Sequence, residues 1–430
     1  MNSIACRLPV LCFVLVYALP SFAADYSEAR QRLIEAYQQQ DFAAMVAAAE
    51  TALQSRPGYP AALYNLAFAH VLNGEPEASL RVLQNLASMN IDFAVEANDA
   101  FLPLQALEGW TGFQENIERI RQPVGSPSIA YELEQGDFIP EGIGFTADGA
   151  LLLGSVRYGN LLRVDENGTE QTISNGARAG HWSVFGMRVL DDGTAWFASS
   201  AVPQHIGHEP EDEGRAGLFR VDLKTGQITA RALLPDDGDE HVLGDVARDG
   251  NGILYTTDSI GGSLFAYDPK ARAFTMLVGP GTFASPQGLT LDASGDYLYV
   301  ADYNGGLVRV ALADGSVEPV TAGENVSLYG IDGLYRHGND LIVIQNGFRP
   351  NRVTRLTLSE DGLSIAAHEI LAMNLPEFDE PTLGSIRDGK FYFVANSHWN
   401  QFNQDNELPL NLRGPVIMVL NLERQGSVDK

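Results

Sequence analysis

Hydrophobic and polar positions follow two different periods along the chain. Up to about residue 122, apolar residues recur every three or four positions, as at Ala29, Leu33 and Tyr37, which is the spacing of amphipathic helices. Beyond Pro127, short apolar runs alternate with turns rich in Asp, Asn and Gly, which predicts antiparallel strands. We therefore expect a small helical domain over residues 24–122, a short linker rich in Pro, Gly and Ser, and an all-β domain over residues 128–424.

The all-β part repeats one phrase, in which a glycine precedes an apolar stretch and an Asp-Gly-type turn. Its copies begin at Pro140, Phe185, Leu243, Pro286, Ile331 and Leu383. A second apolar run follows each turn, such as Tyr297–Val300. Intervals of roughly 40–60 residues are typical of propeller blades, each a four-stranded antiparallel meander. The fold class predicted is an all-β six-bladed β-propeller, preceded by the small α-helical domain.

The last blade lacks one strand in the sequence. Strands are predicted at Ser385–Ile386, Phe391–Val394 and Val416–Leu420, and only a few polar residues follow. The segment Ser128–Leu133 precedes the first blade and has no other partner. We expect it to supply the missing strand and close the ring, because closure removes two exposed sheet edges.

The helical part resembles a tetratricopeptide repeat. The matching positions are Tyr64, Leu66, Ala67, Gly74, Ala78 and Leu83. Small residues stand where packed helices approach closely, and Gly74 stands at the turn. An unrelated helical hairpin is the alternative. Such a region acts either as a spacer or as a groove for a peptide or protein partner.

Composition and the N-terminus restrict the location and the partners. Residues 1–23 have the features of a cleaved signal peptide, namely Arg7, the apolar run Leu8–Leu19 and the small-x-small site Ser21–Ala23. This predicts a periplasmic or secreted protein, with a polar tail at 425–430. No later run is long and apolar enough for a membrane span. The 55 acidic and 28 basic residues give a net charge of -27, which argues against nucleic-acid binding.

The repeat also predicts where the chemistry lies. The first strand of each blade begins, and the second ends, on one face of a propeller. The first-strand starts are Glu141, Phe185, Asp245, Gln287, Asp332 and Ser385. The second-strand ends are Ser155, Ser199, Asp258, Asp302, Tyr303, Asn346, Asn396 and His398. Converging carboxylates repel one another unless they are protonated or bridged by a cation such as Ca²⁺. The alternative is that these side chains form hydrogen bonds between blades.

Residues 128–424 resemble the six-bladed family of gluconolactonase, senescence marker protein and luciferin-regenerating enzyme, most clearly at Ser285–Asp302 and Asp332–Leu334. The resemblance implies a divalent metal held by residues of blades one, three, four and five. By position these are Glu141, Asp245, Gln287 and Asp332. Gln287 replaces an Asn of the family, and Asp245 stands beside Gly244, on which the third-blade Asn would fall.

A catalytic His known from the related paraoxonase shape would fall on Phe185 and is absent, which leaves His181, four residues earlier, as a substitute. The resemblance implies hydrolysis of a lactone or related ester, with the metal polarising the carbonyl and Asp332 as general base. Loop residues of the same face are expected to bind this small-molecule substrate. They are Arg157, Tyr303, Arg349 and His398.

Two other functions stay open. One is a non-catalytic propeller joined to a repeat-type adaptor, binding a protein or carbohydrate in the cell envelope. The other is a metal-free condensing site, as in strictosidine synthase. The oxygens of the predicted metal set distinguish these functions, since a hydrolase of this kind needs them together.

Overall fold

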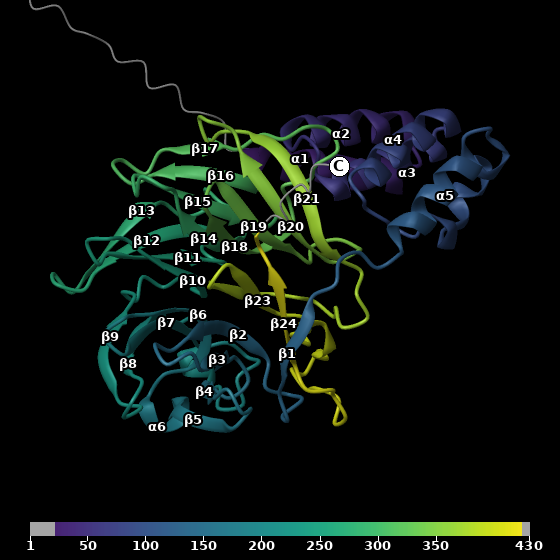
Figure 1. Ribbon diagram of the computed structural model, residues 1–430. Helices are drawn as coiled ribbons and strands as arrows, with labels where there is room; N and C mark the ends of the chain where they lie inside the picture. Colours follow the sequence, from purple (N-terminus) through teal and green to yellow (C-terminus); the bar gives the residue numbers. More distant parts are fainter. Residues whose placement is uncertain (1–21, 424–430) are drawn as a thin grey trace, which may run out of the picture.

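The computed structural model describes residues 22–423, so the predicted signal peptide lies almost entirely, and the polar tail entirely, outside the described residues. A helical domain packs against one side of a large all-β domain (Figure 1). No helix among the described residues has the length and hydropathy needed to cross a membrane.

The helical domain consists of two helical hairpins followed by a more irregular segment. Its elements are α1 (Phe22–Gln38), α2 (Phe42–Ser55), α3 (Pro60–Leu72), α4 (Pro76–Ser88), η1 (Val95–Ala97), η2 (Asp99–Ala106) and α5 (Trp110–Ile120). Local sequence explains the helix starts: the Asp41 side chain accepts a hydrogen bond from Ala44 N, while α3 and α4 begin at prolines. Gly74 turns the chain between α3 and α4 with φ +77°.

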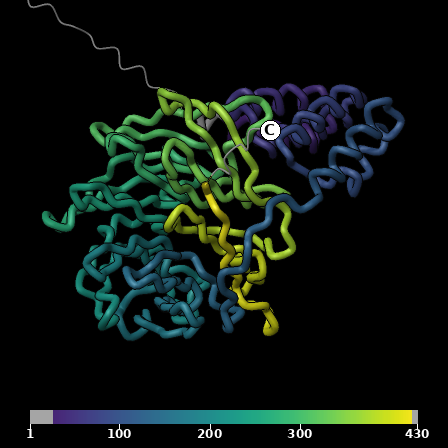
Figure 2. The backbone as a smooth tube through the Cα atoms, viewed as in Figure 1, coloured from purple at the N-terminus to yellow at the C-terminus, as the bar shows by residue number. Residues whose placement is uncertain are grey.

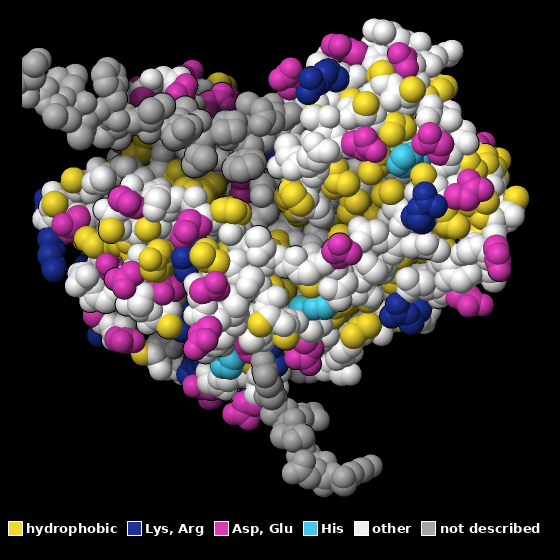
Figure 3. Space-filling model, turned by 90° about the horizontal axis from the view of Figure 1, so that it is seen from above, with side chains coloured by type: hydrophobic (Ala, Val, Ile, Leu, Met, Phe, Trp, Pro, Cys, Tyr) yellow, Lys and Arg dark blue, Asp and Glu magenta, His cyan; other side chains and the backbone are white. Residues whose placement is uncertain are grey.

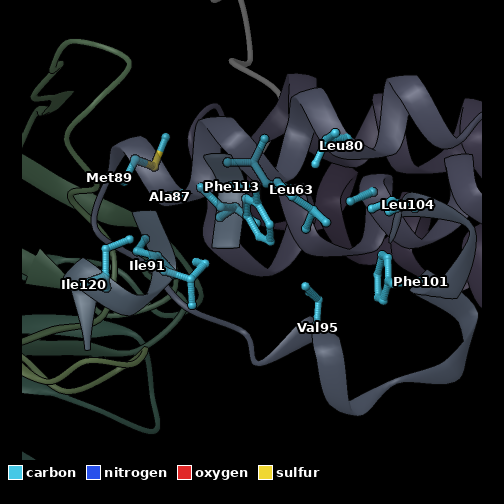
Figure 4. Close-up of a cluster of buried hydrophobic side chains, with 14 of the residues drawn as sticks. Leu63, Leu80, Ala87, Met89, Ile91, Val95, Phe101, Leu104, Phe113 and Ile120 are labelled. Atoms are coloured by element: carbon cyan, nitrogen blue, oxygen red, sulfur yellow. The ribbon is translucent and has the colours of Figure 1, made fainter. Parts of the chain in front are cut away.

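The core of this domain explains its three-four periodicity. Buried side chains of α3, α4 and α5, among them Leu63, Leu80 and Phe113, meet in one cluster (Figure 4). The cluster also contains Phe348, which belongs to the β domain. The hydrophobic core of the helical domain therefore extends into the propeller.

Within residues 22–423 the β domain forms six four-stranded antiparallel sheets, which confirms the six-bladed propeller. The first three blades are β2 (Pro140–Phe145), β3 (Leu151–Ser155), β4 (Asn160–Val164) and β5 (Glu170–Asn175); β6 (Ser183–Val189), β7 (Thr194–Ser200), β8 (Ala216–Asp222) and β9 (Ile228–Leu233); and β10 (Leu243–Arg248), β11 (Leu254–Asp258), β12 (Ser263–Asp268) and β13 (Ala273–Val278). Short helical turns α6 (Gly176–Ala179) and η3 (Pro210–Asp212) lie in the connections of blades one and two.

The last three blades follow in the same order. They are β14 (Pro286–Leu291), β15 (Tyr297–Asp302), β16 (Gly306–Ala311) and β17 (Val317–Pro319); β18 (Ile331–His337), β19 (Asp340–Gln345), β20 (Arg352–Leu358) and β21 (Ile365–Met373); and β22 (Gly384–Arg387), β23 (Lys390–Val394) and β24 (Val416–Asn421) with β1 (Ser128–Glu132). The turn η4 (Trp399–Gln401) lies in the long connection from β23 to β24.

The predicted closure of the ring is confirmed. Strand β1 pairs with β24, so that Ser128 lies opposite Val419 and Glu132 opposite Val416. In Figure 2 the blue segment that leaves the helical domain runs beside the yellow C-terminal strand. The sixth blade thus combines the first and the last strand of the β domain.

The glycines of the repeated phrase let the inner strands approach one another. A Cβ on Gly142 would lie 2.5 Å from Phe185 O, and a Cβ on Gly288 would lie 2.6 Å from Asp332 O. Gly186 is equally close to Asp245, at 2.5 Å from its Cα. Real Cβ contacts are never this short, so a side chain at these positions would force neighbouring blades apart. The glycines of the repeated phrase are therefore required where the inner strands of neighbouring blades approach closely.

Candidate functional site

The inner strands carry an irregularity at the position where the phrase varies. Register shifts interrupt the pairing of inner and second strand between Pro140 and Gly142, and between Ile331 and Leu334. Blades two, three and four have a shift at the equivalent place. Such bulges re-aim a side chain and are common beside functional sites. They explain why Glu141 and Asp332 leave the regular in-out alternation of their strands.

Glu141 and Asp332 form the centre of the candidate site. Glu141 is 6% exposed, and Asp332 is partly buried. Burial raises the pKa of Glu141 well above its usual range, and the negative charge of Asp332 raises it further. The pKa of Asp332 is also raised, first by burial and then by the charges of Glu380 and Asp245. Two carboxylates in this position keep a proton, or attract a cation, where exposed carboxylates would not.

Glu141 and Asp332, called the carboxylate pair below, each accept one hydrogen bond from a neutral side chain. Trp399 Nε1 donates to Glu141 Oε1, and Asn346 Nδ2 donates to Asp332 Oδ2 at 2.7 Å. Both donors favour the ionised carboxylate and lower the pKa values of the pair, but less than burial raises them. The remaining carboxylate oxygens accept no hydrogen bond within the described part of the chain, and they are available to a ligand.

Asp245 lies one step further along its strand than the pair. The third blade reads Gly244-Asp245, whereas blades one and five read Glu141-Gly142 and Asp332-Gly333, so the order of acid and glycine is inverted. Asp245 Oδ1 accepts from the backbone of Val246 at 2.8 Å. Burial raises the pKa of Asp245 to about 6, while backbone donors from Val246 and Leu289 act in the opposite direction.

A tyrosine accompanies Asp245 on the inner strand of blade five. Burial raises the pKa of Tyr335 well above its usual range, and the charge of Asp245 adds more than that of Asp332 or Glu141. The Tyr335 hydroxyl accepts a hydrogen bond from Gly384 N at 2.7 Å. The neutral Tyr335 therefore lies within electrostatic range of three acids.

Sequence analysis missed a fourth acid. Glu380 lies in the loop before β22, with a backbone φ of +60°, a conformation that side chains other than glycine rarely adopt. Its charge raises the pKa of both Glu141 and Asp332. Its Oε2 accepts from Asn400 N at 2.8 Å, and Arg349 lowers its pKa against the larger effect of burial. Glu380 falls outside the repeated phrase, so only its backbone strain distinguishes it.

Gln287 is directed to other partners. Its Oε1 accepts from Ser259 at 3.4 Å and its Nε2 donates to Ser285 at 3.0 Å. Among residues 22–423 no group of three or more His, Cys, Asp or Glu is arranged to hold a metal ion. The structure therefore brings Glu141 and Asp332 together, engages Asp245 with the backbone of its own strand, and leaves Gln287 in a separate hydrogen-bonded group.

Side chains at the ends of the second strands have a structural role instead. Asp302 accepts from Ala284 N and Ser285 N, both at 2.8 Å. Asp258 accepts from Val242 N and from His241 Nδ1. Ser155, Gln345 and Asn396 bond backbone groups of adjoining loops in the same way. These side chains tie each blade to the connection that leads into it.

The long connection from β23 to β24 covers part of the face. Its Trp399, Phe402 and Leu408 pack against a core cluster that includes Ile139 and Phe185. The cover reaches the pair directly, because Trp399 donates to Glu141. Glu141 is therefore approached from the side of Asp332 and Glu380.

Two predicted substrate residues belong to this cover. Arg157 Nη1 donates to the carbonyls of Gln204 at 3.0 Å and Asn406 at 3.2 Å, and it thereby joins three loops. His398 is 5% exposed, and its Nε2 lies 2.9 Å from Arg413 O. Both side chains organise the cover rather than face the pair.

The other two predicted substrate residues, Tyr303 and Arg349, lie nearer the acidic residues of the site. The Tyr303 hydroxyl donates to Asn346 Oδ1 at 2.8 Å, one bond away from Asp332. Arg349 is exposed and lies close enough to Glu380 to lower its pKa. His181, by contrast, is 3% exposed and packs edge-on against Phe197 in blade two, and burial lowers its pKa to about 4. It is a neutral core histidine.

Cavities and charge complete the description. The larger cavity, about 590 Å³, lies between the outer strands β5 and β9 and contains none of the predicted site residues. A cavity of about 80 Å³ lies between the helical domain and blades four and five, with Tyr59 and Tyr303 in its wall. Acidic side chains outnumber Lys and Arg on the surface seen from above (Figure 3), as the net charge of -27 requires.

No family model matches the chain, and no curated protein sequence matches it. Solved structures do resemble it. Regucalcin from Agrobacterium tumefaciens, described as a calcium-binding protein, has 16% identity and a TM-score of 0.49 over 70% of this chain and 96% of its own. A luciferin-regenerating enzyme has 14% identity and a TM-score of 0.49 over 69% and 96%.

A third similar structure is the PQQ-bound aldose sugar dehydrogenase of Streptomyces coelicolor. It has 15% identity and a TM-score of 0.48 over 70% of this chain and all of its own. At such identities the similarity concerns the fold alone, and the function has to be argued from the site.

Proposed function

We propose that this protein is a hydrolase of lactones or related esters and that its reaction takes place at Glu141 and Asp332. The observation that supports this most is the pairing of the buried Glu141 with the partly buried Asp332, whose pKa values are both raised and which each have one hydrogen-bond donor and free oxygens. Perturbed carboxylates in a partly covered face are typical of acid–base sites.

Asp332 is the general base in this proposal. It takes a proton from a water molecule whose oxygen attacks the ester carbonyl carbon, and a tetrahedral intermediate forms. When the ester C–O bond breaks, the leaving oxygen takes this proton from Asp332. A lactone then yields one hydroxy acid. Asn346 holds Asp332 in place during both transfers, while Glu141, fixed by Trp399, forms the opposite wall.

The oxygens of the pair fit a hard divalent cation in their chemistry, and we propose Ca²⁺ as the cofactor. Glu141 and Asp332 would hold it, since their mutual repulsion is what a cation relieves. Bound Ca²⁺ would polarise the ester carbonyl. Water and substrate oxygens would have to supply most of the remaining ligands, because Gln287 is engaged elsewhere.

Arg349, exposed beside Glu380, is our candidate for binding the carboxylate that hydrolysis releases. The predicted signal peptide lies outside the described residues; we propose export to the periplasm or beyond on its sequence alone.

The test is a panel of lactones and aryl esters, assayed with Ca²⁺ and with a chelator. Asp332→Asn should abolish turnover, whereas Asp302→Asn, the same change in a buried carboxylate outside the pair, should retain it in the folded protein. Calorimetric titration should detect Ca²⁺ in the parent and not in a Glu141→Gln/Asp332→Asn double variant. Turnover that survives Asp332→Asn would disprove the proposed mechanism.

A further inference from the structure

We infer that Asn346 is a positioning residue for Asp332, and that the helical domain holds Asn346 in place through the loop that follows it. This inference rests on the proposed function for its kinetic consequence. Its structural part does not depend on that function, because it concerns a series of hydrogen bonds and contacts that the two domains share.

The orientation of the Asn346 amide is fixed on both sides. Asp332 Oδ2 and Pro381 O are acceptors, and they lie 2.7 Å and 3.0 Å from Asn346 Nδ2. They therefore hold the nitrogen of the amide on their side, and the amide oxygen accepts from the Tyr303 hydroxyl at 2.8 Å. Turned the other way, the amide would place its oxygen against a carboxylate and a carbonyl. Tyr303 thus completes the hydrogen bonds of an amide that Asp332 and Pro381 orient.

The loop that carries Asn346 is anchored in the helical domain. Phe348, two residues later, is 8% exposed and belongs to the core cluster of α3, α4 and α5. Arg349 O accepts from Asp92 N at 2.9 Å. Buried Arg352 then donates to the carbonyls of Met89 and Asn90, at the end of α4. Between strands β19 and β20 the chain therefore leaves the propeller, enters the helical core and returns.

Tyr303 is supported from the same side. It lines the 80 Å³ cavity together with Tyr59, which stands at the start of α3. The Tyr59 hydroxyl donates to Asn304 at 3.2 Å, and its ring lies 4.9 Å from that of Tyr329. Gly347 leaves room for Tyr303, since a Cβ there would lie 3.1 Å from its ring and 2.4 Å from Gly330 Cα. Helical residues therefore pack behind Tyr303, which is one of the partners of the Asn346 amide.

The hydrogen bond to Asp332 determines what loss of Asn346 would do. Among the described residues, Asn346 is the side chain that donates to the Asp332 carboxylate, at 2.7 Å. Without this donor the carboxylate could turn away from its water, and the general base would be aligned with that water in a smaller fraction of molecules.

The first experiment compares the steady-state kinetics of full-length Asn346→Ala, Tyr303→Phe and Asn304→Ala. Asn346→Ala should lower kcat about tenfold with KM within twofold, because the base loses its alignment while the substrate still binds. Tyr303→Phe should lower kcat less, because it removes only the hydrogen bond to the amide oxygen. Asn304→Ala removes an interface hydrogen bond of similar type and should leave kcat unchanged. An equal loss of kcat in Asn304→Ala would overturn the inference.

The second experiment needs no activity. The free energy of unfolding is measured at one pH for Asn346→Ala, Asp332→Ala and the double variant. Because the two side chains are hydrogen-bonded, the effect of the double variant should differ from the sum of the two single effects. Additive effects would contradict the inference, even if the protein hydrolyses no ester.

A third variant tests the helical anchor. Phe348→Leu keeps an apolar side chain in the helical core but alters the loop that carries Asn346. We expect a loss of kcat about half as large as that of Asn346→Ala on a logarithmic scale, with KM unchanged, and Leu83→Ile, a change of the same kind in that core, should cause none. If both core variants leave kcat unchanged, the helical domain does not hold Asn346.

Discussion

Two kinds of buried carboxylate lie on the same face of the propeller, and their surroundings differ. Asp302 is 5% exposed and accepts two backbone hydrogen bonds, while Glu141 is 6% exposed and accepts one from Trp399. Burial alone therefore does not distinguish them. The difference is that Asp302 is matched by donors, whereas Glu141 faces another acid. A buried acid with matched donors stabilises a loop, and a buried acid against another acid is available for a ligand or a proton.

The largest expected effect is on activity. Asp332→Asn should reduce lactone or ester turnover on the order of 10³-fold, because the amide cannot take a proton from water. Asp302→Asn should keep turnover within about threefold of the parent per folded molecule. Initial-rate kinetics at matched folded concentration measure both, and comparable losses in the two variants would remove the distinction between the two kinds of acid.

The same pair of variants should differ in stability. Asp302→Asn should lower the free energy of unfolding by about 1–3 kcal/mol, because one of the N–H groups of Ala284 and Ser285 would then face another donor. Urea unfolding followed by tryptophan fluorescence would measure this. An unchanged free energy of unfolding would mean that the loop before β14 does not depend on the Asp302 carboxylate.

Asp332→Asn should act in the opposite direction, and with a pH dependence. The folded-state pKa of Asp332 is raised, so the folded protein binds the proton more tightly than the unfolded chain does, and stability falls as pH rises from the unfolded pKa through the folded pKa. The variant lacks this loss. At pH 8 without Ca²⁺ it should be more stable than the parent by about 1–3 kcal/mol, and near pH 3.5 the difference should vanish.

The smallest expected effect concerns Gln287. Its amide already bonds Ser259 and Ser285, so Gln287→Ala should change Ca²⁺ affinity and turnover less than about threefold. Isothermal titration with Ca²⁺ decides this. Loss of Ca²⁺ binding in Gln287→Ala would mean that the four predicted ligands assemble when the ion is bound, and that the pair is only part of the site.

Much of the fold could be predicted because each blade repeats its own local signals. The Asp-Gly turns, the apolar runs and the unpartnered segment Ser128–Leu133 were enough to predict six blades and their closure. The two members of the pair were also accessible to sequence, since Glu141 and Asp332 occupy equivalent positions in their phrases. Residues at equivalent positions of different copies lie near one another once the six blades form a ring.

The remaining site residues depend on contacts that no repeat encodes. Trp399 lies in a connection that packs against the core of other blades, Glu380 lies in a loop outside the repeated phrase, and Asn346 is oriented by Asp332 and Pro381 O. Asp245 shows the opposite problem. It stands in the phrase, but exchanging the order of glycine and acid moves its carboxylate along the strand. A difference of one residue in a bulge is too small for positional matching to resolve.

The closure of the ring by β1 and β24 also determines an order of events in folding. The first strand of the β domain has no partner until Val416–Asn421 has been synthesised, so the sixth blade forms last on a growing chain. The helical core, apart from Phe348, uses only residues that are made earlier. During synthesis a folded helical domain would therefore precede an open propeller with an unpaired edge, and the contacts of Tyr59 with Asn304 and Tyr329 could form before the loop after β19 reaches the helical core.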